Sequence, residues 1–310
     1  MAWELTLYAL LFIVSLSALL KASGWFVDSA ERIGLSLGIP PFVIGVTIIA
    51  FGTSLPELAS SIAAVLAGES EIVVGNVVGS NITNILLIIG LVAIVSKEVQ
   101  LEFRVMDTEI PLLIGSALLL WFTLRDQQFT WMEVGLLLSA MVVFVVSSMQ
   151  GNGRSPKEDR TKVSWKSYAI LLISIVLVSL GANYTILAIQ KTSSLIGIGS
   201  EILALTVVSL GTSLPEVVVS ITAARKNKVG MAIGNVLGSN IFNTYTVMGI
   251  PALFGKLTIP SGIVDFSLPF MLGVTFFFGF LCITHRISKT EGVLLLSFYL
   301  FFLIELTTNA

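Results

Sequence analysis

Long apolar segments separated by short polar ones dominate the hydrophobicity pattern of this 310-residue chain. An apolar segment of about 17–25 residues is long enough to cross a bilayer as a helix. About ten such segments occur, near residues 4–23, 40–67, 72–95, 109–124, 131–149, 167–189, 201–223, 231–254, 266–284 and 290–306. The pattern therefore predicts an all-α integral membrane protein with about ten transmembrane helices.

The composition agrees with a lipid environment. Only 12% of the residues are charged and the mean hydropathy is +0.97, whereas soluble domains carry about 25% charge. This excludes a large soluble helical enzyme. The first segment carries Glu4 rather than a basic flank, so we interpret it as a membrane span and not as a signal peptide. The single cysteine, Cys282, excludes an internal disulfide and a cysteine-based metal site.

The chain contains an internal repeat. Shifted by 159 residues, it overlays itself without a gap, and residues 52–90 and 211–249 share 18 identities in 39 positions. We expect residues 1–149 and 166–310 to form two five-span repeats, joined by a short polar linker at 150–165. Because five is odd, the second repeat enters the membrane from the opposite side, as in transporters with inverted repeats and a binding site at the midplane.

The basic residues predict the orientation. With ten spans, fourteen of the seventeen Lys and Arg residues fall in connections on one side of the membrane. Because basic residues favour the cytoplasmic side, we expect the 150–165 linker to be cytoplasmic. Both termini are then extracytoplasmic, in a multi-pass protein of the cell membrane.

The peptide GTSLPE occurs twice inside apolar segments, at residues 52–57 and 211–216. Pro56 has no backbone N–H, so the carbonyl of Gly52 loses its helical partner, and we expect a break or kink around residues 50–55. Within lipid, such freed carbonyls are tolerated only when they are buried in protein or line a wet cavity. A capping role for Ser54 and Glu57 is compatible with this arrangement.

The glutamate of each copy is the least expected residue. An acid at the bilayer centre costs about 2.5–3.5 kcal/mol on insertion scales, more than the roughly 1 kcal/mol that a helix cap contributes. We therefore predict that Glu57 and Glu216 serve a binding site. The hydroxyls of the two peptides would add neutral oxygen ligands, from Thr53, Ser54, Thr212 and Ser213.

A second repeated block adds further polar groups. GNVVGSNITN at residues 75–84 matches GNVLGSNIFN at 234–243. The G-x-x-x-G spacing in each predicts close packing of helices. Ser80 with Asn84, and Ser239 with Asn243, lie one turn apart, and we expect them to line the site. Asn81 and Asn240 fit helix capping at least as well.

The combined set contains oxygens and no imidazole or thiolate. It suits hard cations such as Ca²⁺ or Na⁺ rather than transition metals. The only histidine, His285, lies beside Arg286 at the end of a span. Without a Ser-His or Cys-His pair in one span, an intramembrane hydrolase is disfavoured, and two proline-containing inverted segments suit alternation better than a continuous channel.

These paired blocks resemble the α-repeats of the calcium/cation antiporter superfamily, and most closely its prokaryotic sodium/calcium exchanger branch. The resemblance covers nearly the whole chain. It implies that Glu57 and Glu216 are the central calcium-coordinating acids, assisted by backbone oxygens at Thr53 and Thr212. It also implies sodium sites formed by Thr53, Ser54, Ser80, Thr212, Ser213 and Ser239, to which the carbonyls of Ala50 and Ser209 contribute. Asn84 and Asn243 match the pair of residues at the middle of the site.

The resemblance also implies a mechanism. In family members the first and sixth spans slide across the remaining helices to alternate access. We expect a non-enzymatic Na⁺/Ca²⁺ antiporter that needs no cofactor and has the lipid bilayer and the two ions as its only implied partners. A H⁺/Ca²⁺ exchanger using the same glutamates remains the alternative. Asn243 replaces the aspartate of some relatives, which argues against potassium co-transport.

Overall fold

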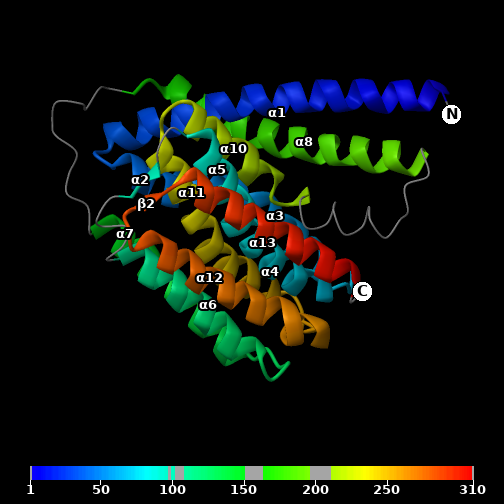
Figure 1. The fold of residues 1–310 in the computed structure, drawn as a ribbon, viewed down its shortest axis with the longest axis vertical. Helices are drawn as coiled ribbons and strands as arrows, with labels where there is room; N and C mark the ends of the chain where they lie inside the picture. The colour runs from blue at the N-terminus through cyan, green and yellow to red at the C-terminus, as the bar shows by residue number, and fades with distance from the viewer. Residues whose placement is uncertain (1, 97–98, 102–107, 151–162, 196–210, 309–310) are drawn as a thin grey trace.

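The computed structural model describes residues 2–96, 99–101, 108–150, 163–195 and 211–308, which fold into a bundle of helices (Figure 1). Within these ranges the only sheet is a two-stranded one, in which β1 (Val99–Gln100) pairs antiparallel with β2 (Arg286–Ile287). The expected all-helical architecture therefore holds apart from this short pairing between two connections.

The first half of the chain forms helices in five stretches. Two of them change from α- to π-helical geometry along their length. The segments are α1 (Ala2–Ser36); α2 (Pro41–Ile44), π-helix η1 (Gly45–Ile49) and α3 (Ala50–Leu66); α4 (Glu71–Thr83), π-helix η2 (Asn84–Ile89) and α5 (Gly90–Val95); α6 (Ile110–Leu124); and α7 (Trp131–Gln150).

The second half repeats this order. Its described segments are α8 (Trp165–Leu195); α10 (Leu214–Arg225); α11 (Val229–Phe242) with π-helix η5 (Asn243–Val247) and the 3₁₀ turn η6 (Pro251–Leu253); π-helix η7 (Ile263–Ser267) with α12 (Leu268–Cys282); and α13 (Lys289–Thr308). Most of the predicted linker and the first part of the predicted seventh span, residues 201–210, lie outside the described ranges.

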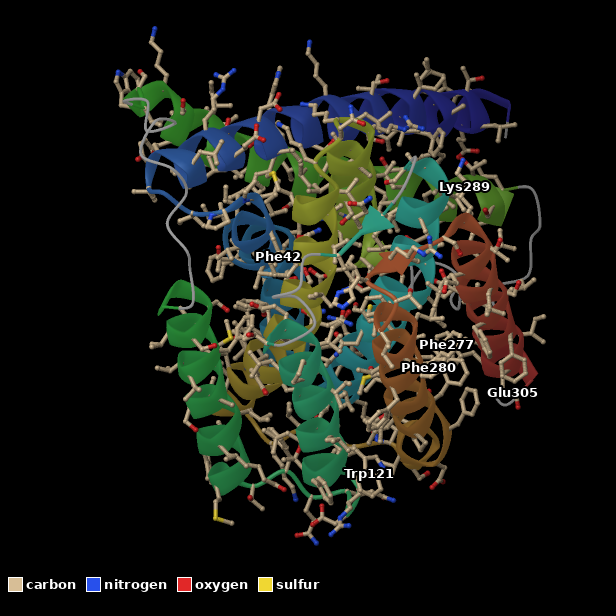
Figure 2. All side chains as sticks on the ribbon, turned by 60° about the vertical axis from the view of Figure 1, so that its left-hand side comes forward. Phe42, Trp121, Phe277, Phe280, Lys289 and Glu305 are labelled. Atoms are coloured by element: carbon tan, nitrogen blue, oxygen red, sulfur yellow. The ribbon has the colours of Figure 1, made fainter. Side chains whose placement is uncertain are left out.

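The outer surface of the helix bundle fits a lipid environment. Six described segments are long and apolar enough to cross a membrane, namely Trp3–Ser36, Pro41–Leu66, Glu71–Val95, Trp131–Ser148, Trp165–Leu195 and Ile263–Cys282. Large apolar side chains such as Leu10, Leu172 and Phe280 are exposed on the outside of the bundle. Figure 2 shows Phe280 on α12 and Trp121 at the end of α6 among these outer side chains. Such extensive apolar exposure is rare on soluble monomers.

Helices α1 and α8 lie side by side along one face of the other helices (Figure 1). They run in opposite directions, because Leu19 lies against Gly181 while the earlier Ser15 accepts a 2.9 Å hydrogen bond from the later Thr185. Close approach at a glycine and a hydrogen bond between helices are the contacts that hold helices together in lipid. The first helix of each half thus packs antiparallel on its counterpart, as inverted repeats require.

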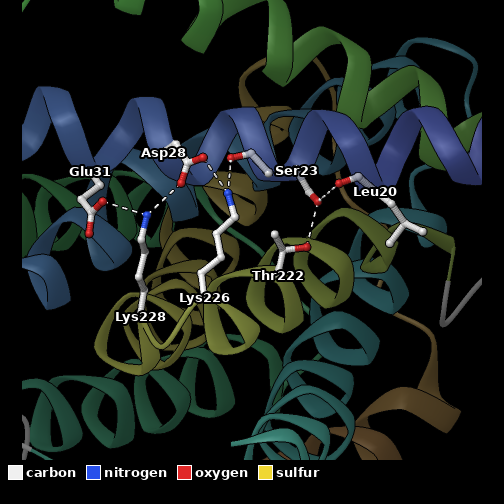
Figure 3. Close-up of polar contacts among 8 residues, drawn as sticks. Leu20, Ser23, Asp28, Glu31, Thr222, Lys226 and Lys228 are labelled. Carbon is white, nitrogen blue, oxygen red and sulfur yellow. Dashed lines mark hydrogen bonds and ion pairs between the residues drawn. The ribbon is translucent and has the colours of Figure 1, made fainter.

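An ion-pair cluster ties α1 to the turn between α10 and α11 (Figure 3). Asp28 lies 2.7 Å from Lys226 and 2.9 Å from Lys228, and Glu31 lies 2.7 Å from Lys228. Burial lowers the pKa of Lys228, but its hydrogen bonds to Glu31 and Asp28 outweigh that effect and raise the pKa above its usual value. The two acids therefore pair with lysines of the second half of the chain.

Glycines bring α11 against the η1 segment. A Cβ atom on Gly234 would lie 2.3 Å from the carbonyl oxygen of Phe42, and one on Gly238 would lie 2.3 Å from the carbonyl oxygen of Val46. The predicted packing role of these two glycines is therefore confirmed. For Gly75 and Gly79 it stays a prediction, because the stretch that the repeat places opposite them lies outside the described residues.

Gly234→Ala tests this packing. The added methyl group meets rigid backbone atoms, so we expect the substitution to destabilise the protein by about 1–3 kcal/mol and to lower its melting temperature in detergent. Gly115→Ala on α6 is the matched control, since apart from its chain neighbours and the backbone of its own helix no atom in the described structure lies within 4 Å of the position that its Cβ would take. Equal melting temperatures for the two variants would contradict the close packing.

Candidate cation-binding site

The two copies of the repeated peptide differ in backbone structure. Residues Gly52–Glu57 are helical, and α3 continues through Pro56, with the π-helical turn η1 just before it. In the second copy, Thr212 and Ser213 form a turn, and α10 begins at Leu214. The first copy therefore does not unwind at residues 50–55, because the helix accommodates the proline. Since Pro56 has no N–H, the carbonyl of Gly52 still lacks its usual helical donor.

Both glutamates are buried in the centre of the bundle. Glu57 is 1% and Glu216 0% exposed, and the two carboxyl groups lie close enough to interact electrostatically. Ser54 of the first copy donates a 3.0 Å hydrogen bond to Oε1 of Glu216 in the second. The two repeats thus bring their acids together and share a hydroxyl across the interface.

Other hydroxyl groups of the two blocks make hydrogen bonds across the two repeats. Ser80 and Thr212 lie 3.3 Å apart as a hydrogen-bonded pair between the repeats. Thr53 donates to Oδ1 of Asn235 at 3.2 Å and approaches the carbonyl of Ala50 at 3.3 Å. The threonines that the sequence placed in one site therefore contact polar groups from the opposite repeat.

The two asparagines predicted to line the site begin the π-helical turns. Asn84 is the first residue of η2, and Asn243 is the first residue of η5. Turns of π-helix are rare and frequent at functional sites. Both side chains are fully buried. The amide of Asn84 donates a 2.9 Å hydrogen bond to Oδ1 of Asn240.

Buried polar atoms that make no hydrogen bond in the described structure gather among these residues. They are both carboxylate oxygens of Glu57, Oε2 of Glu216, the hydroxyls of Ser213 and Ser239, Oδ1 of Asn84, and both terminal amide atoms of Asn243. Each such atom costs about 1–3 kcal/mol when it has no partner. A set of mainly oxygen atoms around two carboxylates fits a hard cation as the missing partner.

Of the twelve residues predicted for the site, ten are buried and Thr212 is half-buried, while Ser209 lies outside the described residues. Across the parts of the chain that the structure describes, no group of three or more His, Cys, Asp or Glu residues is placed to hold a metal ion. The charge available to a cation at the centre therefore comes from two carboxylates.

Four asparagines connect this set to the rest of the bundle. Asn81 and Asn240 do not cap helices: they make hydrogen bonds across the repeats, to Thr244 at 3.0 Å and to the carbonyl of Asn81 at 3.2 Å, respectively. Asn76 and Asn235 bind Ser61 and Ser220 at 3.2 and 2.9 Å. The pattern of the sequence did not predict the roles of Asn76 and Asn235, although all four asparagines lie in the repeated second block.

A cavity of about 600 Å³ reaches the second peptide from one side. It lies between α3, α8 and α10, and Thr212 is one of its lining residues. Polar groups along it come from Ser60, Asn183 and Gln190. The candidate site is therefore next to a partly polar opening formed by helices of both halves.

Several known proteins are similar to this chain in sequence and in fold. A family model described as sodium/calcium exchanger protein matches residues 7–150 and 166–308. The sodium/calcium exchanger MaX1 of Methanosarcina acetivorans is 33% identical over 97% of this chain and 99% of its own length. The putative antiporter CaxA of Alkalimonas amylolytica is 31% identical over 94% of this chain and 96% of its own length.

A solved structure extends this likeness to three dimensions. The sodium-calcium exchanger NCX_Mj, soaked with Na⁺ and Sr²⁺, has a TM-score of 0.84 and 29% sequence identity, covering 96% of this chain and 98% of its own. The all-helical membrane exchanger fold is thus shared along nearly the full length. The match of the family model on both halves agrees with the repeat found in the sequence. The chain belongs to the sodium/calcium exchanger protein family.

Proposed function

We propose that this protein is a secondary active antiporter that exchanges Na⁺ for Ca²⁺ across the membrane by alternating access. Its family consists of transporters, so the chain is a multi-pass membrane transporter for cations including Ca²⁺ and not an enzyme. Sodium as the coupling ion is the specific part of the proposal. It is supported by the names of the relatives and by the oxygen-rich centre of the bundle.

The observation that carries the proposal is the set of unpaired buried oxygens beside Glu57 and Glu216. Two carboxylates balance the charge of one Ca²⁺ or two Na⁺ ions, and the neutral oxygens replace part of the water shell that either ion loses. Because both ions use the same oxygen chemistry, they would compete for Glu57 and Glu216. Competition for one site that opens to the two sides in turn is a physical basis for exchange.

The proposed topology has ten spans in two inverted repeats, with helices interrupted near the midplane. The antiparallel packing of α1 on α8 and the turn at Thr212 and Ser213 support it. With both termini outside, the second half of α8 approaches the outer surface. The cavity is lined there by Asn183 and Gln190, so in the proposed orientation it lies toward the outer side of the membrane.

A H⁺/Ca²⁺ exchanger is the second candidate. The closeness of two buried carboxylates favours it, because like charges in an apolar region disfavour double ionisation unless a cation is present. A proton could then take the place of sodium at the same pair. Family membership is compatible with both coupling ions.

Calcium uptake into proteoliposomes distinguishes the two. We expect a Na⁺ gradient directed out of the vesicles, at equal pH on both sides, to drive ⁴⁵Ca²⁺ uptake, and a pH gradient without Na⁺ to drive none. Protein-free vesicles provide the background. Uptake that follows the pH gradient and ignores the Na⁺ gradient would overturn sodium coupling.

Glu57→Gln and Glu216→Gln test the site. Glutamine keeps the shape of the side chain but removes the charge that the cation needs, so we expect each variant to lose calcium transport to background levels while still inserting and purifying as a monodisperse protein. Glu71→Gln is the matched control, because Glu71 lies exposed in the first turn of α4. Transport in either test variant at more than half the unmodified rate would remove that residue from the site.

A further inference from the structure

Asn240 is a buried side chain outside the predicted ligand set that contacts a member of that set. It lies on α11 at 2% exposure. Its Nδ2 donates to the backbone carbonyl of Asn81 at 3.2 Å, and its Oδ1 accepts from Nδ2 of Asn84 at 2.9 Å. Both ends of the Asn240 amide are therefore bonded to the first repeat.

The chemistry of these partners fixes the direction of every bond. A backbone carbonyl can only accept, so Asn240 must present its NH₂ group to Asn81 and its oxygen to Asn84. Asn84 must then donate, which places its NH₂ group on Asn240. The remaining atom, Oδ1 of Asn84, is buried and makes no hydrogen bond in the described structure. The backbone carbonyl of Asn81 thus determines the orientation of the Asn84 amide, because it fixes the orientation of Asn240, which lies between them.

We propose that Asn240 is a positioning residue, which holds the amide of Asn84 with its carbonyl oxygen toward the cation. This inference rests on the proposed function. Without Asn240, the Asn84 amide loses the interaction that distinguishes its two ends. The end facing the ion can then be an NH₂ group, which repels a cation and supplies no ligand.

The second repeat does not contain the same arrangement. The repeat relates Asn240 to Asn81 and Asn84 to Asn243, but the side chain of Asn81 donates to Thr244 at 3.0 Å. Both terminal atoms of Asn243 remain without a hydrogen bond in the described structure. In this conformation the positioning device therefore acts on one of the two related amides. Oδ1 of Asn81 also makes no hydrogen bond in the described structure, but the side chain of Asn81 bonds neither Asn84 nor Asn243, so Asn81 controls for the loss of a buried amide that positions neither of them.

Calcium binding to the purified full-length protein tests the proposal. We expect Asn240→Ala to weaken Ca²⁺ binding at least tenfold by isothermal titration calorimetry. Asn81→Ala removes an equally buried amide but keeps the backbone carbonyl that Asn240 uses, so we expect a change of less than threefold. Equal losses in the two variants would show that buried amides matter only for packing and would overturn the proposal.

A second experiment, in a variant that already carries Asn84→Asp, distinguishes a positioning role of Asn240 from a packing role. In Asn84→Asp both terminal atoms are oxygens, so either end can face the cation, and adding Asn240→Ala should not weaken Ca²⁺ binding more than threefold. A tenfold loss that persists in this background would overturn the proposal. So would complete loss of binding in Asn84→Asp alone, because an extra oxygen at an ion-facing position should not prevent binding.

Three outcomes remain to be distinguished. If Asn240→Ala does not purify as a monodisperse protein, Asn240→Ser replaces it, and failure of both would assign Asn240 a purely structural role and overturn the inference. If the unmodified protein binds no Ca²⁺, the proposed function fails first, and the inference fails with it. Normal binding by the unmodified protein together with normal binding by Asn240→Ala would overturn the positioning role alone.

Discussion

Two carboxylates buried side by side in an apolar bundle are the constraint on which the rest of this structure depends. Glu57 and Glu216 are 1% and 0% exposed, and removing such charges from water costs several kcal/mol per ion unless other charges and hydrogen bonds compensate. In the described structure, one hydroxyl, that of Ser54, donates to this pair. In the proposed function, a transported cation replaces the missing partners, and this would give the costly arrangement its role.

The duplicated sequence places these acids together but does not give them identical surroundings. The first peptide lies within a continuous helix, whereas the second includes a turn at Thr212 and Ser213. Thr53 reaches Asn235, while Thr212 bonds Ser80 instead of the equivalent Asn76. A transporter that opens to one side at a time must be asymmetric at any moment, so the unequal partners of equivalent residues fit a single state of an alternating cycle.

Much of this could be predicted from the sequence because lipid restricts the possible structures. Apolar length predicted the helices, and the repeat predicted that residues 159 positions apart, such as Glu57 and Glu216, would meet. Partner choice could not be predicted from pattern alone. Asp28 pairs with Lys226 and Lys228, far away in the chain, and Asn240 binds Asn84 because η2 packs against α11. Such contacts depend on how helices pack in three dimensions.

The central claim is that the two inverted peptides form one cation site between them. The most direct measurement is anomalous diffraction from crystals of the protein soaked with Ca²⁺. The account predicts a strong peak between Glu57 and Glu216, with oxygen ligands from both repeats at about 2.3–2.6 Å. It also predicts that this peak weakens as Na⁺ is added. A calcium peak coordinated by one repeat only, or a centre that stays without calcium at saturating concentration, would contradict it.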